Sequence, residues 1–120
     1  MVFKSFSHWK EKLQQYGNMD NVFIIVEGKN DESVLSKWQI KNIVTLKGKR
    51  LYDVVEELEL ADLCIILVDI DKQGEKLFKK LKFLFEREGI PVETSFREYL
   101  KNFPIKEIEE LPVLETGGIV

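Results

Sequence analysis

The stretch CIILVDIDKQG, residues 64–74, decides the fold of this chain. Its first five residues are apolar with no alternation of polar side chains, which is typical of a strand buried on both faces. A second stretch, VFIIVEGKND at residues 22–31, has the same form, with five apolar residues followed by acids and a glycine. Only the central strands of a sheet are covered on both sides, so we expect these two strands to be central neighbours.

The segments around these strands alternate between helix and strand signals. Leu51, Val54, Val55 and Leu58 fall at i, i+3, i+4 and i+7, the spacing of one apolar helix face. A similar apolar stripe precedes Gly89. The expected elements are, in order, a helix at residues 7–16, a strand at 22–26, a helix at 31–38, a strand at 43–46, a helix from 51, a strand at 64–68, a helix ending before 89, an edge strand at 90–94, and short helices at 96–103 and 105–111.

Strands that alternate with helices form a parallel sheet with right-handed crossovers. We therefore predict an α/β fold with a compact four-stranded parallel sheet, in an order such as 2-1-3-4, flanked by helices on both faces in the Rossmann-like manner. The 120 residues are expected to form a single domain at 1–120. Its N-terminal helix is at 7–16 and a C-terminal helical tail occupies 101–120.

Composition excludes several classes of protein. Hydrophobic residues make up 44% of the chain and charged residues 32%, so a folded core is expected and disorder is not. No apolar run approaches the ~20 residues of a membrane span, and we predict no membrane partner. The single cysteine, Cys64, reads as a core residue and indicates a reducing, cytoplasmic location. No Gly-x-Gly-x-x-Gly or Walker motif follows any strand, which predicts no nucleotide cofactor.

Acidic side chains follow both central strands at the point where each strand ends. Glu27 follows the first of them, and Asp69 and Asp71 follow the other. Open α/β sheets bind ligands at this edge, and carboxylates gathered there repel one another unless a cation joins them. With no histidine or cysteine nearby, such oxygen ligands select Mg²⁺, or Mn²⁺, over zinc. We therefore expect these three side chains to bind one metal ion.

Three further residues of these stretches are expected to assist the site. Asp31 adds a fourth acid, while Gly28 and Gly74 let the backbone turn sharply and leave room for a phosphate. A purely structural interpretation of the acids stays open, because each precedes a helix, where a carboxylate caps the first turn or faces the helix dipole. This structural interpretation fits Glu27 and Asp69 less well, because each comes before the cap position of the helix that follows it. We assign the cap of the helix at 31–38 to Asn30 or Asp31.

The two acidic motifs together resemble those of the Toprim family, which includes topoisomerases, bacterial primases and the 5S ribosomal RNA maturation nuclease. The family has Glu-Gly after its first strand, matched by Glu27 and Gly28, and Asp-x-Asp after its third, matched by Asp69 and Asp71. The resemblance covers about residues 21–100. It implies that Glu27 is the general acid/base of phosphodiester chemistry, that the two aspartates bind magnesium, and that Asp31 assists. Val68 departs from the family, where many relatives carry threonine.

The net charge of -3 hides blocks of opposite sign. Residues 29–50 and 72–82 are rich in lysine, whereas residues 53–62 and the tail are acidic. Because a metal would cancel much of the carboxylate charge, we expect a basic face at the site, with the acidic helix and tail away from it. The expected phosphate or nucleic-acid contacts are Lys29, Lys47, Lys49, Arg50, Lys72 and Lys76.

These features lead to the hypothesis of a magnesium-dependent nuclease, or nuclease subunit, acting on RNA or DNA. A second hypothesis is a non-catalytic module that binds metal and nucleic acid, or that docks on a larger processing, repair or replication complex with the acidic tail as its protein contact. A third is that the acids are only structural. A receiver domain would need a fifth strand ending in lysine, and a haloacid-dehalogenase-type phosphatase has its Asp-x-Asp after the first strand, so both are set aside.

Overall fold

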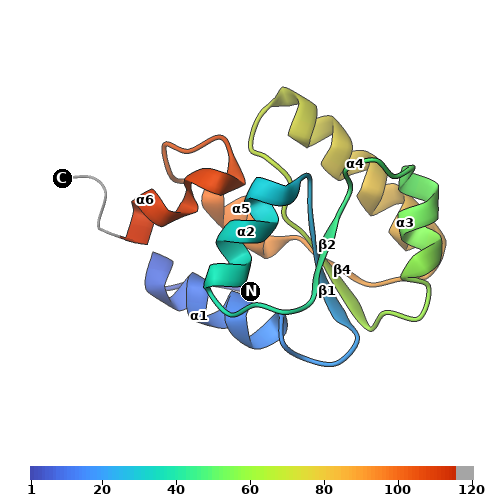
Figure 1. Cartoon of the computed structure of the whole chain (residues 1–120), viewed down its shortest axis with the longest axis horizontal. Coiled ribbons are helices and arrows are strands. Elements are labelled where there is room, and N and C mark those ends of the chain that lie inside the picture. The colour runs from blue at the N-terminus through green and yellow to red at the C-terminus, as the bar shows by residue number, and fades with distance from the viewer. Residues whose placement is uncertain (116–120) are drawn as a thin grey trace.

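The computed structural model describes residues 1–115 and contains one four-stranded parallel sheet (Figure 1). Its strands are β1 (Val22–Val26), β2 (Ile43–Thr45), β3 (Leu63–Ile66) and β4 (Val92–Glu93), in the order β2-β1-β3-β4. The predicted fold class and strand order are therefore confirmed. β4 pairs only with β3, so it is an edge strand, and the Pro91 carbonyl before it accepts from the Cys64 N–H at 2.9 Å.

The register of the two central strands makes their carboxyl ends level. Ile24 is opposite Ile65 and Ile25 is opposite Ile66, and the Leu67 N–H continues the pairing to the Ile25 carbonyl at 2.8 Å. The chain beyond each strand therefore leaves the sheet at the same edge, on adjacent strands. This edge is the topological switch point of the sheet, where open α/β folds bind ligands.

Helices cover both faces of the sheet, as predicted (Figure 1). Of the helices within residues 1–115, α3 and α4 alone pack on one face, with Val54, Phe78 and Phe85 among their buried side chains. The remaining helical elements cover the other face. The helical elements are α1 (Phe6–Tyr16), α2 (Lys29–Lys37), α3 (Leu51–Glu57), α4 (Lys72–Arg87), α5 (Ser95–Leu100), the 3-10 helix η1 (Ile108–Glu110) and α6 (Leu111–Glu115).

The central strands divide their side chains between two apolar cores. Ile24 and Ile65 point into the core under α1, α2 and α5, whereas Ile25 and Ile66 point into the core under α3 and α4. All four side chains are fully buried, and Cys64 is buried with them, so its expected role as a core residue is confirmed. Burial raises the pKa of the Cys64 thiol to about 12. No helix within residues 1–115 is long and apolar enough to cross a membrane.

β3, β4 and α5 are shorter than predicted: β3 ends at Ile66 and not at 68, β4 spans only Val92–Glu93, and α5 ends at Leu100 and not at 103. Two further helix boundaries differ from the prediction for identifiable reasons. α2 begins at Lys29, not at 31, because Gly28 is its N-cap and Asp31 occupies the third helical position, with its carboxylate accepting the Gly28 N–H. The expected cap at Asn30 or Asp31 was therefore wrong. The expected helix at 105–111 is instead η1 followed by α6, which begins at Leu111 and has Pro112 in its first turn, where a missing N–H is tolerated. Residues 116–120 of the predicted tail lie outside the described residues.

We predict that the buried hydrogen bond of Trp9 fixes α1 against α5. The indole Nε1–H donates to the Phe96 carbonyl at 2.9 Å, and the Trp9 side chain is fully buried. Trp9→Phe removes this bond and leaves a gap, so the free energy of unfolding in urea should fall by about 1–3 kcal/mol. Trp38→Phe is the matched control, because the Trp38 indole N–H has no hydrogen-bond partner within residues 1–115. Equal losses in the two variants would contradict this role of the bond.

Candidate functional site

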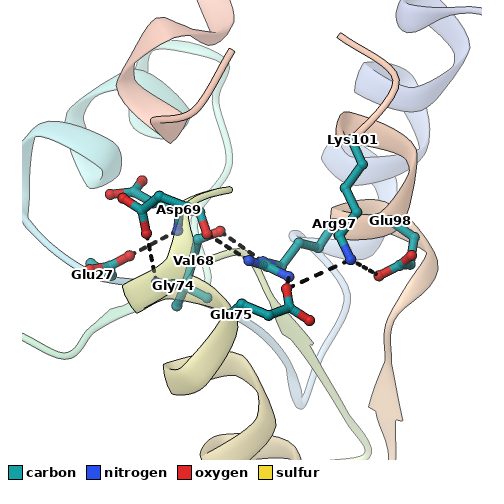
Figure 2. A network of polar contacts seen from close by, with 9 residues as sticks. Glu27, Val68, Asp69, Gly74, Glu75, Arg97, Glu98 and Lys101 are labelled. Carbon is teal, nitrogen blue, oxygen red and sulfur yellow. Dashed lines mark hydrogen bonds and ion pairs between the residues drawn. The ribbon is translucent and has the colours of Figure 1, made fainter. Parts of the chain in front are cut away.

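The centre of the candidate site is a hydrogen bond between the two acidic motifs. The Asp69 N–H donates to Glu27 Oε2 at 2.8 Å, which links the chain after β3 to the chain after β1 (Figure 2). The two residues are far apart in sequence but adjacent in space because β1 and β3 are parallel neighbours with level ends. The structure therefore brings Glu27 and Asp69 together at the carboxyl edge of the sheet.

Each of the other predicted acids is also held by a backbone N–H. Asp31 Oδ2 accepts from Gly28 at 3.1 Å, and Asp69 Oδ1 accepts from Ile108 at 3.0 Å. Asp71 is the N-cap of α4, and its Oδ1 accepts the Gly74 N–H at 2.7 Å. The structural role that the sequence left open for Asp31 and Asp71 is thus present. In each of the two carboxylates, one oxygen accepts a hydrogen bond from a backbone N–H.

The carboxylates share a partly desolvated, negatively charged environment. Burial is the main cause that raises the pKa of Glu27, and the charges on Asp69, Asp71 and Asp31 raise it further against the opposing hydrogen bond from the Asp69 N–H. Burial is likewise the main cause that raises the pKa of Asp31 and of Asp69. Within residues 1–115, none of these four acids forms a salt bridge. The cluster therefore favours any ligand that supplies positive charge.

A hollow of about 300 Å³ opens beside these acids, and the chain after α5 forms part of its wall. Glu107 and Glu109 line it together with Glu27, Asp31 and Asp69. The expectation that the acidic tail lies away from the site was therefore wrong. Two backbone hydrogen bonds bring the tail there: the Ile108 N–H to Asp69 Oδ1, and the Ile70 N–H to the Lys106 carbonyl at 2.6 Å.

The hollow is consequently acidic. The expectation of a basic face at the site was therefore wrong. Five acids line the hollow, against the two lysines Lys29 and Lys47. The other tail acids are engaged within the chain, since Glu110 accepts from the backbone of Lys106 and Glu107, and Glu115 pairs with Lys10 at 2.6 Å. A divalent cation, and not a bare phosphate, is the ligand that this charge attracts.

The predicted phosphate contacts divide into three groups. Lys29 and Lys47 line the acidic hollow, and Lys76 lines a second hollow that also includes Glu27. Lys49 and Lys72 are exposed and line neither of these two hollows, and Arg50 pairs with Asp53 at 3.3 Å. The basic residues are therefore not gathered into one surface around the carboxylates.

Sequence reasoning missed Arg97, a buried cation beside the loop that carries Asp69 (Figure 2). Its guanidinium donates to the carbonyls of Val68 at 3.1 Å and Asp69 at 2.7 Å, and to the Glu75 carboxylate at 2.7 Å. The hydrogen bond to Arg97 is the main cause that holds the pKa of Glu75 below its ordinary value. Because these partners lie 22 to 29 residues away in sequence, no local motif marks Arg97.

Gly74 is required by close packing under the same loop. A Cβ at this position would overlap the Asp69 carbonyl group and approach Asp71 Oδ1 at 3.1 Å. Gly28, in contrast, has open space where a side chain would project. The glycine of the third-strand motif therefore sets how closely α4 approaches the loop that carries the aspartates.

The oxygen donors fit a hard divalent cation by their chemistry. No histidine or cysteine lines the acidic hollow, and its acids repel one another. In the part of the chain that the structure describes, no three of these side chains are arranged as a ready-formed metal site. At least one carboxylate would therefore have to turn for an ion to be shared.

Comparison with known proteins places the chain in a family. A UPF0292 protein of Pyrococcus horikoshii is 33% identical over 108 residues, which span 89% of this chain and 79% of that protein. The chain belongs to the UPF0292 family. A solved structure of a protein from Aquifex aeolicus is 41% identical, with a TM-score of 0.83, and covers 89% of this chain and 98% of that one. No family model matches the chain.

More distant similarity relates this UPF0292 protein to primases. DNA primase DnaG of Thermoplasma acidophilum is 27% identical over 73 residues, 61% of this chain and 16% of that protein. The zinc-binding and RNA polymerase domains of the Aquifex aeolicus primase superpose with a TM-score of 0.52 and 26% identity, over 90% of this chain and 27% of that one. The UPF0292 protein is thus a primase-related α/β module.

Gly74→Ala in this UPF0292 protein should displace the loop that carries Asp69. The added methyl group overlaps backbone atoms that cannot move independently of β3, so we expect a loss of about 1–3 kcal/mol in the free energy of unfolding. The Asp69 amide should also exchange with solvent deuterium faster, because its bond to Glu27 is strained. Gly28→Ser is the control and should leave both quantities near those of the parent, because a side chain has open space there and serine is a good N-cap residue. A stable Gly74→Ala protein with unchanged Asp69 exchange would refute this packing constraint.

Arg97→Lys should destabilise the protein although it keeps the charge. A lysine ammonium cannot reach the Val68, Asp69 and Glu75 oxygens together in the planar geometry of a guanidinium, and the site is fully buried. We expect a loss of about 2–4 kcal/mol in urea unfolding. Arg87→Lys, at an exposed arginine paired with Glu88 at 3.5 Å, should change stability by less than about 0.5 kcal/mol. Similar effects of the two substitutions would argue against the role of Arg97.

Proposed function

We propose that this UPF0292 protein is a Toprim-like module that performs Mg²⁺-dependent phosphodiester chemistry on nucleic acid, as a nuclease or nuclease subunit. One observation carries the proposal: Glu27 and Asp69 meet in a partly buried acidic cluster without a cationic partner in residues 1–115. The primase-related fold supports a nucleic-acid substrate. A cytoplasmic location is part of the proposal and agrees with a single, buried cysteine.

Glu27 is the residue we assign to proton transfer. Its raised pKa lets the carboxyl group exist in both protonation states nearer neutral pH than an ordinary glutamate, which is what a general acid/base requires. The hydrogen bond from the Asp69 N–H holds Oε2, so the other oxygen, Oε1, is the atom that exchanges a proton with the substrate. Burial and the neighbouring acids thus tune the group for catalysis.

Asp69 and Asp71 are the residues we assign to a divalent ion, with Asp31 in support. Asp69 and Asp71 each have one carboxylate oxygen in a backbone hydrogen bond, and in residues 1–115 no backbone N–H donates to the second oxygen. A bound Mg²⁺ or Mn²⁺ neutralises charge on the phosphate and relieves the repulsion among the acids. Lys29 and Lys47, which line the same hollow, are the residues we assign to the phosphate backbone.

A second candidate function is a non-catalytic module that binds metal and nucleic acid. The excess of acids in the hollow favours it, because an acidic surface repels phosphates whenever the metal is absent. On this alternative the carboxylates would hold a cation, which would supply positive charge for binding nucleic acid, and no cleavage would follow. Docking on a larger processing complex through the acidic tail is a further form of the alternative. Fewer tail carboxylates are free for such a contact than the sequence indicates, because Glu110 and Glu115 are engaged within the chain.

Glu27→Gln and Asp69→Asn should abolish metal-dependent cleavage. Labelled single-stranded and duplex RNA and DNA are incubated with Mg²⁺ or Mn²⁺, or with EDTA, and the products are resolved on gels. Loss of the proton-transfer group should reduce the rate about 10²–10⁴-fold in Glu27→Gln. Glu56→Gln, an exposed acid on α3, is the control and should cleave like the parent. If Glu27→Gln and Asp69→Asn cut every substrate that the parent cuts, the assignment is wrong.

The melting temperature distinguishes this proposal from a purely structural role of the acids. Mg²⁺ at 100 times its dissociation constant would stabilise the parent by about 2.7 kcal/mol, whereas Asp69→Asn should lose most of this gain. At neutral pH without metal, Glu27→Gln should melt about 2 °C higher than the parent, because it removes repulsion but keeps an acceptor for the Asp69 N–H. An unchanged melting temperature of the parent in Mg²⁺ or Mn²⁺ would support the structural role.

A further inference from the structure

The second hollow lies between α3 and α4 and has a volume of about 720 Å³. It starts at Glu27, so it adjoins the acidic hollow, but its other walls have a different chemistry. Leu51 and Leu77 give it apolar walls, Lys76, Lys79 and Lys80 supply positive charge, and Phe83 adds an aromatic ring to its lining. We call this hollow the α4 groove.

The groove follows one stripe of α4. Gln73, Lys76, Leu77, Lys80 and Phe83 fall at i, i+3, i+4, i+7 and i+10, so they lie on the same helix face. At 1.5 Å per residue this stripe is about 15 Å long. It runs from the N-terminal turn of α4, next to the carboxylates, to the solvent-exposed middle of the helix.

The basic and aromatic side chains of the groove are available to a ligand. Lys76, Lys79 and Lys80 are exposed and form no ion pair within residues 1–115. The Phe83 side chain is 63% exposed, unusual for a large apolar residue, and the Arg87 guanidinium lies 5.8 Å from its ring centre. An aromatic face flanked by cations suits a ligand that has both negative charges and flat rings.

We propose that the α4 groove binds a single-stranded segment of nucleic acid and directs it to Glu27. Lys76, Lys79 and Lys80 hold the phosphates, and an unpaired base stacks on Phe83. A duplex keeps its bases stacked on one another, so it cannot use Phe83 in this way. The inference rests on the proposed function, because the bound nucleic acid is directed to Glu27 as the catalytic residue. It adds that the substrate is single-stranded and that it binds a surface outside the carboxylate cluster.

Charge complementarity favours nucleic acid over other occupants. The groove places three unpaired lysines on a chain whose net charge is -3, whereas the adjoining hollow is acidic. An apolar peptide would gain from Leu51, Leu77 and Phe83 but would not need the three cations, whereas a second copy of this acidic chain could pair with the cations but would not need to stack a ring on Phe83. These occupants are outcomes that the experiment below separates.

The test measures binding in EDTA, where neither metal nor cleavage contributes. Fluorescein-labelled dT12, rU12 and a 12-base-pair duplex are titrated with the parent protein at low salt, and fluorescence anisotropy is recorded. We expect the single strands to bind more tightly than the duplex. Lys76→Gln with Lys80→Gln should weaken single-strand binding at least fivefold and lower the slope of log K against log salt by about 1.4, which is about 0.7 for each lost phosphate contact. Phe83→Ala should weaken it at least about fivefold without changing that slope.

Matched controls separate the groove from general charge and from misfolding. Lys37→Gln with Lys41→Gln removes two exposed lysines near the opposite end of the strands, and it should bind like the parent. Phe83→Leu keeps an apolar side chain but no ring, so it should bind like Phe83→Ala, whereas an apolar peptide site would tolerate it. Melting temperatures of all variants should match the parent, because the changed side chains are exposed.

Three results would overturn the inference: no binding of single strands by the parent, equal binding by the groove variants, or an equal loss in the Lys37/Lys41 control. None of these results bears on metal-dependent cleavage, which is tested by Glu27→Gln and Asp69→Asn. Conversely, groove-dependent binding without any cleavage would leave the groove in place and remove the catalytic proposal. Failure of one proposal is therefore distinguishable from failure of the other.

Discussion

The hydrogen bond from the Asp69 N–H to the Glu27 carboxylate, 2.8 Å long, is the interaction on which the rest of the site depends. It forms because two apolar strands pair in parallel with their ends level, so the loop that follows β3 brings the Asp69 N–H to the side chain that follows β1. Every other feature of the site is arranged around it. Arg97 holds the Asp69 carbonyl, Gly74 lets α4 approach the same peptide, and the Ile108 N–H holds the Asp69 side chain.

This arrangement concentrates negative charge where the sheet and helices exclude part of the solvent. Burial and mutual repulsion raise the pKa of Glu27 and Asp69, and the tail adds Glu107 and Glu109 to the same hollow. The adjoining α4 groove has the opposite charge, and Glu27 lines both. The cationic α4 groove thus adjoins the acidic hollow at Glu27. Such a division suits a polyanion that is gripped along one surface and meets a bound divalent ion at the other.

Sequence predicted the features that depend on local pattern. The apolar runs at β1 and β3 are unambiguous because both faces of these strands are buried, and the acids that follow them must then share one edge. Features made by long-range contacts were not predictable. Arg97 lies in a short helix with no motif, and its partners come from the end of β3 and from α4. The position of the tail depends on long-range hydrogen bonds donated by the backbone N–H groups of Ile70 and Ile108, which no local sequence pattern marks. Charge blocks alone therefore placed Glu107 and Glu109 on the wrong surface.

The central claim is that the acids after β1 and β3 bind one divalent ion between them. Diffraction from crystals grown with Mn²⁺, recorded where manganese scatters anomalously, locates such an ion directly. The account predicts one strong anomalous peak within coordination distance, about 2.0–2.6 Å, of carboxylate oxygens from both Glu27 and Asp69, with at least one carboxylate turned from its present position. A fully occupied Mn²⁺ elsewhere on the protein, with Glu27 and Asp69 still joined by the same backbone bond and no peak beside them, would contradict it.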